Sequence, residues 1–106
     1  MAPHRLAEVL RDEHWQVIDV REPYERDAGH LAGTRHIELA QLTAQAESVD
    51  RERPVVFYCR VGSRSAMAMQ AFRAAGYDAY NLTGGIVNWV QAGLPLEPED
   101  GHVAKH

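Results

Sequence analysis

The chain has 106 residues, of which 45% are hydrophobic, and this size predicts one domain because a second core would have too few residues. Its 11 Lys and Arg residues against 15 Asp and Glu give a net charge of −4, which argues against nucleic-acid partners. No segment approaches the roughly 20 apolar residues of a membrane-spanning helix, and Met1 to Arg5 lack the apolar region of a secretion signal. We therefore expect a cytoplasmic protein with no membrane or nucleic-acid partner.

Hydrophobic spacing and turn residues predict the elements in chain order. These are a helix over 5–11, a strand over 15–20, a short strand near His36, a helix over 39–49, a strand over 54–59, a helix from about Ser63 to Ala75, a strand over 78–82 and a helix over 86–90. The clearest strand is the run Val55-Val56-Phe57-Tyr58, whose β-branched and aromatic residues are typical of a strand buried on both faces. Strands that alternate with helices need crossover connections. The sequence therefore predicts an α/β fold with a central, mostly parallel sheet of four to five strands and helices on both faces.

The single cysteine and the scattered histidines limit metal and redox chemistry. Cys59 has no second cysteine with which to form an internal disulfide or a thiol metal site. His102 and His106 stand four apart within residues 98–106, which we assign to a polar C-terminal tail after one domain over residues 1–97. Proline and glycine in this tail argue against the helix that would align the two histidines. We therefore favour a surface tail over a metal site.

The segment after the third strand carries the chemistry, and it reads Cys59-Arg60-Val61-Gly62-Ser63-Arg64-Ser65. A lone cysteine at a strand end is more often a small buried hydrophobic residue than a nucleophile. Here, however, the chain turns at Gly62 into a helix, so backbone N–H groups without helical partners face the inside of the loop and form an anion cradle. Arg60 and Arg64 add positive charge with no acidic residue between them, and both effects favour a thiolate at the mouth of the loop. Solvated surface charge, the alternative role for the arginines, explains neither the glycine nor the placement between strand and helix.

At this point the chain resembles the rhodanese-like sulfurtransferases, over about residues 5 to 97. The shared motifs, in order, are Asp19-Val20-Arg21-Glu22, Gly29-His30-Leu31-Ala32-Gly33, the Cys59 to Arg64 loop, and Leu82-Thr83-Gly84-Gly85 followed by Trp89, Ala92, Gly93 and Pro95. In this family a loop of six residues from Cys through Arg is typical of sulfur transfer, whereas seven residues fit a larger phosphate or arsenate. The loop here has six. Two departures are the short segment before the first helix, which favours four strands over five, and Ala32, where the family commonly has proline.

The resemblance implies a two-step transfer through a covalent intermediate on Cys59. The thiolate attacks the outer sulfur of a small anionic donor such as thiosulfate, sulfite leaves, and a Cys59 persulfide forms. The backbone N–H groups of the substrate-binding loop then hold the terminal sulfur until it passes to cyanide in an assay, or to a small-molecule or protein thiol in the cell. The residues that supply them are Arg60, Val61, Gly62, Ser63, Arg64 and Ser65. Arg60 and Arg64 also attract the donor, no cofactor or metal is implied, and we expect a monomer.

Other residues of the shared motifs are interpreted as structural. Asp19 and Arg21 follow a buried strand, so we expect them to pair with neighbouring charges or to cap a turn. We expect His30 to bond to the backbone rather than act as a general base, which a preformed thiolate does not need. Trp89 lies at helical spacing from Ile86 and is expected in the core.

Three functions remain open on the sequence alone. A sulfurtransferase or persulfide carrier is favoured over a non-catalytic binding or sensing module, because Cys59 is present. Phosphatase or arsenate-reductase chemistry is least favoured because the loop has six residues rather than seven.

Overall fold

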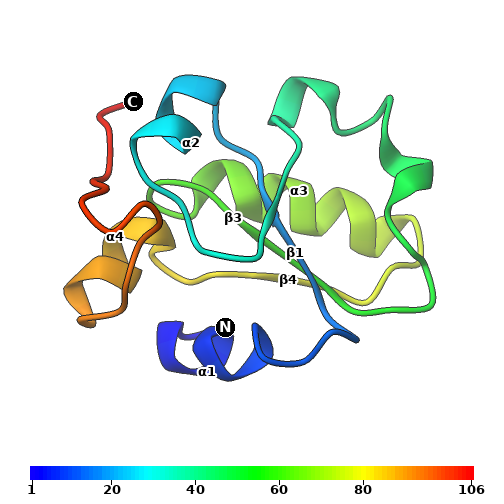
Figure 1. Ribbon diagram of the computed structural model, residues 1–106. Helices are drawn as coiled ribbons and strands as arrows, with labels where there is room; N and C mark the ends of the chain where they lie inside the picture. Colours follow the sequence, from blue (N-terminus) through cyan, green and yellow to red (C-terminus); the bar gives the residue numbers. More distant parts are fainter.

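The computed structural model describes all residues from 1 to 106, which form one sheet with helices around it. In chain order the elements are α1 (Pro3–Val9), β1 (Gln16–Asp19), α2 (Pro23–Ala28), β2 (Arg35–His36), η1 (Leu39–Gln41), η2 (Ala46–Ser48), β3 (Val55–Tyr58), α3 (Ser63–Ala74), β4 (Ala79–Asn81) and α4 (Gly85–Gln91). All strand pairs are parallel, and the strand order is β2-β1-β3-β4 (Figure 1). The predicted parallel α/β sheet is therefore confirmed, with four strands. None of the helices combines the length and the apolar character needed to cross a membrane.

Strand β3 lies in the middle of the sheet because all four of its side chains are apolar or aromatic and can be buried on both faces. Val55 and Phe57 point into one core cluster, and Val56 and Tyr58 point into the other. Parallel pairing with β1 and β4 brings the C-terminal ends of these three strands to the same edge of the sheet. Cys59, the next residue along the chain, therefore lies at that edge.

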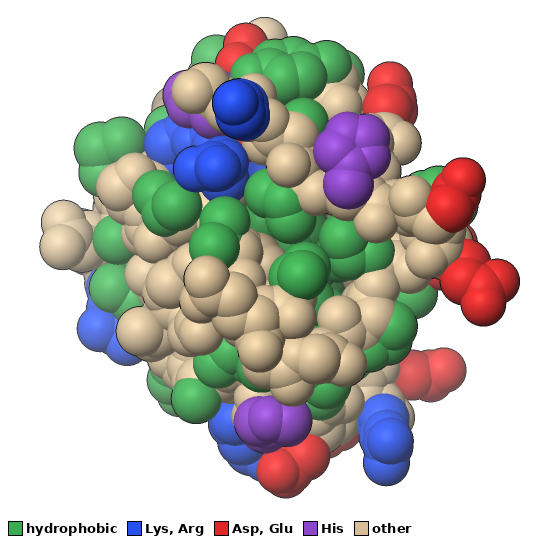
Figure 2. All heavy atoms as spheres, turned by 90° about the vertical axis from the view of Figure 1, so that its left-hand side faces the viewer, with side chains coloured by type: hydrophobic (Ala, Val, Ile, Leu, Met, Phe, Trp, Pro, Cys, Tyr) green, Lys and Arg blue, Asp and Glu red, His purple; other side chains and the backbone are tan.

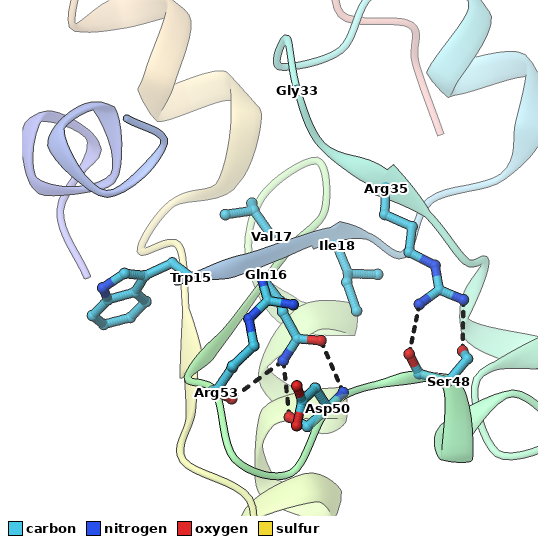
Figure 3. Close-up of a pocket in the computed structure, with 9 residues that line it drawn as sticks. All are labelled: Trp15, Gln16, Val17, Ile18, Gly33, Arg35, Ser48, Asp50 and Arg53. Atoms are coloured by element: carbon cyan, nitrogen blue, oxygen red, sulfur yellow. Dashed lines mark hydrogen bonds between the residues drawn. The ribbon is translucent and has the colours of Figure 1, made fainter. Parts of the chain in front are cut away.

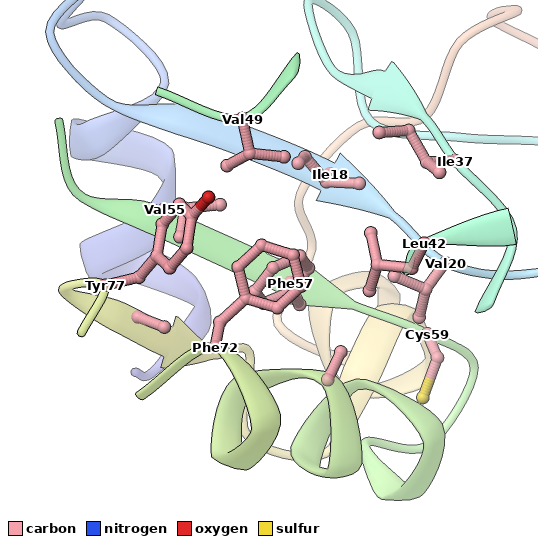
Figure 4. Close-up of a cluster of buried hydrophobic side chains, with 12 residues drawn as sticks. Ile18, Val20, Ile37, Leu42, Val49, Val55, Phe57, Cys59, Phe72 and Tyr77 are labelled. Atoms are coloured by element: carbon pink, nitrogen blue, oxygen red, sulfur yellow. The ribbon is translucent and has the colours of Figure 1, made fainter. Parts of the chain in front are cut away.

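Two hydrophobic clusters cover the two faces of the sheet. The first packs the sheet against α3 and the η1–η2 segment, and Figure 4 shows it from the side of α3. Its members are Ile18, Val20, Ile37, Leu42, Val49, Val55, Phe57, Cys59, Ala68, Phe72, Tyr77 and Ala79. The second packs the sheet against α1 and α4, and it contains Leu6, Val9, Val17, Leu31, Val56, Tyr58, Leu82, Ile86 and Trp89. Helices on both faces and the buried position of Trp89 confirm the sequence predictions.

The predicted helix over residues 39–49 is wrong, because the chain forms two separate 3₁₀ turns there. Side chains from distant parts of the chain donate hydrogen bonds to carbonyl oxygens in the second half of the segment. The Tyr77 hydroxyl donates to the Ala46 carbonyl oxygen at 3.1 Å, and the Arg35 guanidinium donates to the Ser48 carbonyl oxygen at 3.0 Å. These bonds favour a compact double turn over a continuous helix, and hydrophobic spacing alone does not reveal them.

Helix α2 lies in a segment for which hydrophobic spacing predicts no element. Pro23 takes the first helical position, where its missing N–H is no loss and its fixed φ suits the helix. Glu22 and Glu25 form a capping box, in which the Glu25 carboxylate accepts a bond from the Glu22 N–H at 3.1 Å. The Glu-Pro-x-Glu pattern of residues 22–25 is therefore the local signal that identifies this helix.

Residues 98–106, predicted to be a polar tail, run beside α2, as the C-terminal segment in Figure 1 shows. The His102 N–H donates to the Ala28 carbonyl oxygen at 2.9 Å, and the Tyr24 hydroxyl donates to the Lys105 carbonyl oxygen at 3.0 Å. The segment contains no helix, as its proline and glycine indicate. It is an irregular segment that packs on the surface of the domain.

Candidate active site

Three polar groups lie within hydrogen-bond distance of the Cys59 sulfur. They are the N–H of Gly62 at 3.1 Å, the N–H of Ser65 at 3.5 Å and the hydroxyl of Ser65 at 3.3 Å. Figure 4 shows the Cys59 sulfur at the margin of the first cluster, directed toward α3. Since N–H groups present partial positive charge, a sulfur anion at this position is stabilised.

Gly62 produces this geometry, because it has φ of +100° and is the N-cap residue of α3. The left-handed turn directs the Gly62 N–H back toward the sulfur, while Ser65 lies in the first turn of the helix, where N–H groups have no helical partner. Arg60, Val61 and Ser63 donate no hydrogen bond to the sulfur, and Val61 is half exposed. Two amides thus contact the sulfur, and the binding of a second, terminal sulfur by the remaining loop amides stays a prediction.

Arg64 forms a two-pronged ion pair with Glu25 of α2, with N–O distances of 2.8 and 3.0 Å. Burial opposes the charge on Glu25, but the bonds from Arg64 and from the Glu22 backbone outweigh it, so the pKa of Glu25 is lowered. The guanidinium that the sequence assigned to the anionic donor therefore already has a buried carboxylate partner. Sequence analysis missed Glu25, and the Glu-Pro-x-Glu pattern that starts α2 is the signal that points to it.

Asn81, the last residue of β4, connects two parts of the Cys59 loop. Its Oδ1 accepts from the Ser65 hydroxyl at 2.5 Å, and its Nδ2 donates to the Gly62 carbonyl oxygen at 3.3 Å. It thus holds both residues whose N–H groups contact Cys59. Sequence analysis assigned Asn81 no role, because it belongs to a different strand and precedes the shared motif at Leu82.

The first turn of α4 is hydrogen-bonded to the backbone of the Cys59 loop. The N–H of Ile86 donates to the Cys59 carbonyl oxygen at 2.9 Å, and the N–H of Val87 donates to the Arg60 carbonyl oxygen at 3.1 Å. Gly85 has φ of +64°, and a Cβ atom there would lie 2.6 Å from the Cys59 carbonyl oxygen. Only glycine therefore allows α4 to start this close to the loop.

A buried ion pair at the end of β1 is structural. The Arg21 guanidinium donates to both carboxylate oxygens of Asp19, at 2.9 and 2.8 Å, and to the Gly29 carbonyl oxygen at 2.8 Å. Neither charged side chain has exposed surface, which confirms the predicted pairing of Asp19 and Arg21. His30 contacts the backbone as expected, with its Nδ1 at 3.2 Å from the Arg26 carbonyl oxygen.

Access to the sulfur is restricted, because Cys59 is 0% exposed and lines none of the five surface pockets. The expected position at an open loop mouth is wrong: Gly62, Ser65 and the surrounding core enclose the side chain. A pocket of about 370 Å³ adjoins the loop, and Arg64, Glu22 and Glu38 contribute to its lining. A donor therefore reaches the sulfur only when side chains around the loop move apart.

The surface around this edge of the sheet is mixed in charge. Figure 2 shows the face that bears α4 and the C-terminal segment, with Lys and Arg side chains gathered at its upper left and Asp and Glu side chains along its right side. An anionic donor therefore meets no uniformly positive field here.

The pocket drawn in Figure 3, of about 300 Å³, lies away from Cys59. It includes Gln16, the first residue of β1, and therefore lies toward the N-terminal edge of the parallel sheet. Its cations already have partners: Arg35 bonds to Ser48, and Arg53 bonds to backbone carbonyl oxygens. The pocket thus offers no unpaired charge for an anionic substrate.

Residues 2–92 match the family described as Rhodanese-like domain. Protein YqhL of Bacillus subtilis is 43% identical over 75 residues, which cover 70% of this chain. Thiosulfate sulfurtransferase GlpE of Pseudomonas aeruginosa is 34% identical over 90 residues, covering 84% of this chain and 81% of that protein. The crystal structure of a rhodanese-related protein from Thermoplasma volcanium superposes with a TM-score of 0.84 at 28% identity, covering 91% of this chain and 94% of that one.

The curated relatives differ in length from this chain. The chain spans 60% of YqhL and 54% of the protein slr1261 of Synechocystis, but most of GlpE. The match to these longer proteins therefore identifies the domain alone.

Proposed function

Because this chain belongs to the rhodanese-like domain family, we propose that it is a sulfurtransferase that acts through a persulfide on Cys59. It takes a sulfane sulfur from thiosulfate or a related donor and passes it to a nucleophilic acceptor. The observation that carries the proposal is the convergence of two backbone N–H donors, from Gly62 and Ser65, on one cysteine sulfur. The name of GlpE, thiosulfate sulfurtransferase, supports the same chemistry.

The reaction consists of two displacements at sulfur. In the first, the Cys59 thiolate forms a bond to the outer sulfur of thiosulfate, the sulfur–sulfur bond of thiosulfate breaks, and sulfite leaves with the electron pair. In the second, cyanide or a thiolate attacks the terminal sulfur of the persulfide, and the Cys59 thiolate leaves. Both steps balance in atoms and electrons without another redox partner.

The loop residues stabilise the negative charge on sulfur and hold the reacting groups in place during these steps. The N–H groups of Gly62 and Ser65 stabilise the Cys59 thiolate before attack and again when it leaves. The remaining loop amides bind the terminal sulfur, which carries the negative charge of the persulfide. Because Arg64 is paired with Glu25, it contributes to the site as part of a neutral pair and orders the loop by holding it to α2.

Intact-protein mass spectrometry after incubation with thiosulfate tests the proposal. We expect a gain of about 32 Da, one sulfur atom, that cyanide removes. Cys59→Ser is the matched control, because the serine hydroxyl accepts the same hydrogen bonds and keeps the fold, yet cannot form the adduct. If wild-type protein gains no sulfur although Cys59 reacts with an alkylating reagent, the proposed thiosulfate chemistry is wrong. That result would favour a binding module or a carrier loaded by a protein donor.

A further inference from the structure

The Ser65 hydroxyl has two possible acceptors and only one proton. It lies 2.5 Å from Asn81 Oδ1 and 3.3 Å from the Cys59 sulfur, and Ser65 has no exposed surface. A hydroxyl donates one hydrogen bond at a time, so it faces either the amide or the sulfur. The shorter distance identifies Asn81 as its partner in this structure.

The orientation of the Asn81 amide follows from its other contact. Nδ2 lies 3.3 Å from the Gly62 carbonyl oxygen, which can only accept a hydrogen bond. The NH₂ group must therefore face Gly62, and the amide oxygen must face Ser65. Asn81 can then only accept from Ser65, and the oxygen of that hydroxyl turns a lone pair toward Cys59.

We propose that Asn81 is a positioning residue that holds the Ser65 hydroxyl away from the Cys59 sulfur while that sulfur is uncharged. When the thiolate forms, the hydroxyl rotates and donates to it, and Asn81 loses its partner. The inner sulfur of a persulfide is again uncharged, so the hydroxyl returns to Asn81. This last step rests on the proposed function, whereas the difference between thiol and thiolate does not.

The same competition favours the loaded state of the protein. Asn81 stabilises the thiol and the persulfide, in which the hydroxyl bonds to the amide, relative to the free thiolate. The backbone N–H groups of Gly62 and Ser65 also face the sulfur, but they cannot rotate as a hydroxyl does, so they do not take part in the exchange. Asn81 therefore raises the free energy of the thiolate relative to the persulfide, which favours attack of the thiolate on a sulfur donor.

Charged groups near the loop do not account for this exchange. Those on the loop are Arg60 and Arg64, with Glu25 of α2 beside Arg64. At the end of β1, Asp19 pairs with Arg21 and lies 3.5 Å from Arg26 of α2. None of these side chains is hydrogen-bonded to Ser65 or Asn81, so substitution of Asn81 leaves them in place.

The test measures the rate of Cys59 alkylation by iodoacetamide as a function of pH, with no sulfur donor present. We expect Asn81→Ala to lower the midpoint of this profile by about 0.5 to 1 pH unit, the range for one neutral hydrogen bond removed from competition. Ser65→Ala is expected to raise the midpoint, and Asn81→Ala added to Ser65→Ala is expected to cause no further change. Asn88→Ala is the matched control, because its amide bonds to the Thr83 carbonyl oxygen and should leave the midpoint unchanged.

Two results would overturn the proposal. An unchanged or raised midpoint in Asn81→Ala would show that the amide does not compete for the hydroxyl. The same shift with and without Ser65 would show that Asn81 acts through Gly62 instead. If Asn81→Ala does not fold, Asn81→Leu replaces it: an apolar side chain of similar size cannot accept from the hydroxyl, so the midpoint should fall, and an unchanged or raised midpoint would refute the proposal.

A second readout addresses the persulfide. At a pH above the alkylation midpoint, where unloaded Cys59 is the thiolate, and at a fixed, subsaturating thiosulfate concentration, we expect Asn81→Ala to carry about three- to tenfold less persulfide relative to unloaded protein than wild type, by intact-mass measurement. Equal loading would overturn the role of Asn81 in the loaded state. If wild type itself forms no persulfide, the proposed function fails, and the alkylation result still decides the thiol–thiolate part.

Discussion

Substitution of Gly85 by alanine tests how the start of α4 controls the Cys59 loop. A Cβ atom at this position would lie 2.5 Å from the carbonyl carbon of Arg60 and 2.6 Å from the carbonyl oxygen of Cys59. Both contacts are with backbone, which cannot rotate away as a flexible side chain can. Either α4 or the loop must therefore shift.

The expected loss of stability has two parts. Alanine at φ of +64° costs roughly 1 to 2 kcal/mol, because L-residues disfavour the left-handed region. The shift also disrupts the bonds from Ile86 and Val87 to the loop, each contributing about 1 kcal/mol. We therefore expect Gly85→Ala to lower the free energy of unfolding by about 3 to 4 kcal/mol. Since a 1 Å misplacement of reacting groups can reduce turnover by roughly 100-fold, sulfur transfer should fall by about that factor.

Gly93→Ala provides the matched control at the other end of α4. Gly93 has φ of +81°, and a Cβ atom there meets nothing within 4 Å, so only the conformational cost of about 1 to 2 kcal/mol applies. Urea unfolding should separate the two variants by about 2 kcal/mol, and the thiosulfate–cyanide assay should show full activity for folded Gly93→Ala. Equal destabilisation of both variants, with activity retained in Gly85→Ala, would refute the close-contact argument.

Two further substitutions follow from buried polar contacts. Arg64→Ala leaves the carboxylate of Glu25 buried and unpaired, so we expect a loss of about 3 kcal/mol at neutral pH in urea unfolding. Because the pKa of Glu25 is lowered from its ordinary value of 4.5 in the folded protein, this difference from wild type should shrink as the pH falls below 4.5, and a constant difference would contradict the pairing. Tyr58→Phe removes the oxygen that accepts from the Leu31 N–H at 3.2 Å, which should cost about 1 to 2 kcal/mol. Burial raises the pKa of Tyr58 from 10.0 to about 12, so wild-type stability should fall as the pH rises through this interval, with a smaller fall in Tyr58→Phe; equal falls would refute the assignment.

Local patterns in the sequence determined the sheet and the position of Cys59 at its edge. The run from Val55 to Tyr58 is buried on both faces as its composition predicts, and Cys59 follows it at the C-terminal edge. Gly62 before Ser63 marks the start of α3, which the structure places at the same residue. These features are local, because strand burial and helix starts depend on residues within one or two turns of chain.

The sequence predicted secondary structure less well where distant side chains form hydrogen bonds with the backbone or where apolar residues are few. Residues 39–49 have helical spacing, yet bonds from Tyr77 and Arg35 accompany two 3₁₀ turns instead. Helix α2 has too few apolar residues for its spacing to be recognised, and only its capping pattern identifies it. The spacing of apolar residues within a segment thus does not show whether distant side chains will form hydrogen bonds with its backbone.

The partners of the Cys59 loop were decided by tertiary structure alone. Ser65 meets Asn81 across 16 residues of sequence, and Arg64 meets Glu25 across 39. The order β2-β1-β3-β4 brings the ends of β1, β3 and β4 together, so residues from separate segments reach one loop. The sequence alone predicted which atom reacts, because the cysteine, the glycine and the helix start are contiguous. The fold decided which side chains orient and enclose that atom, because hydrogen-bond partners are selected by proximity in space.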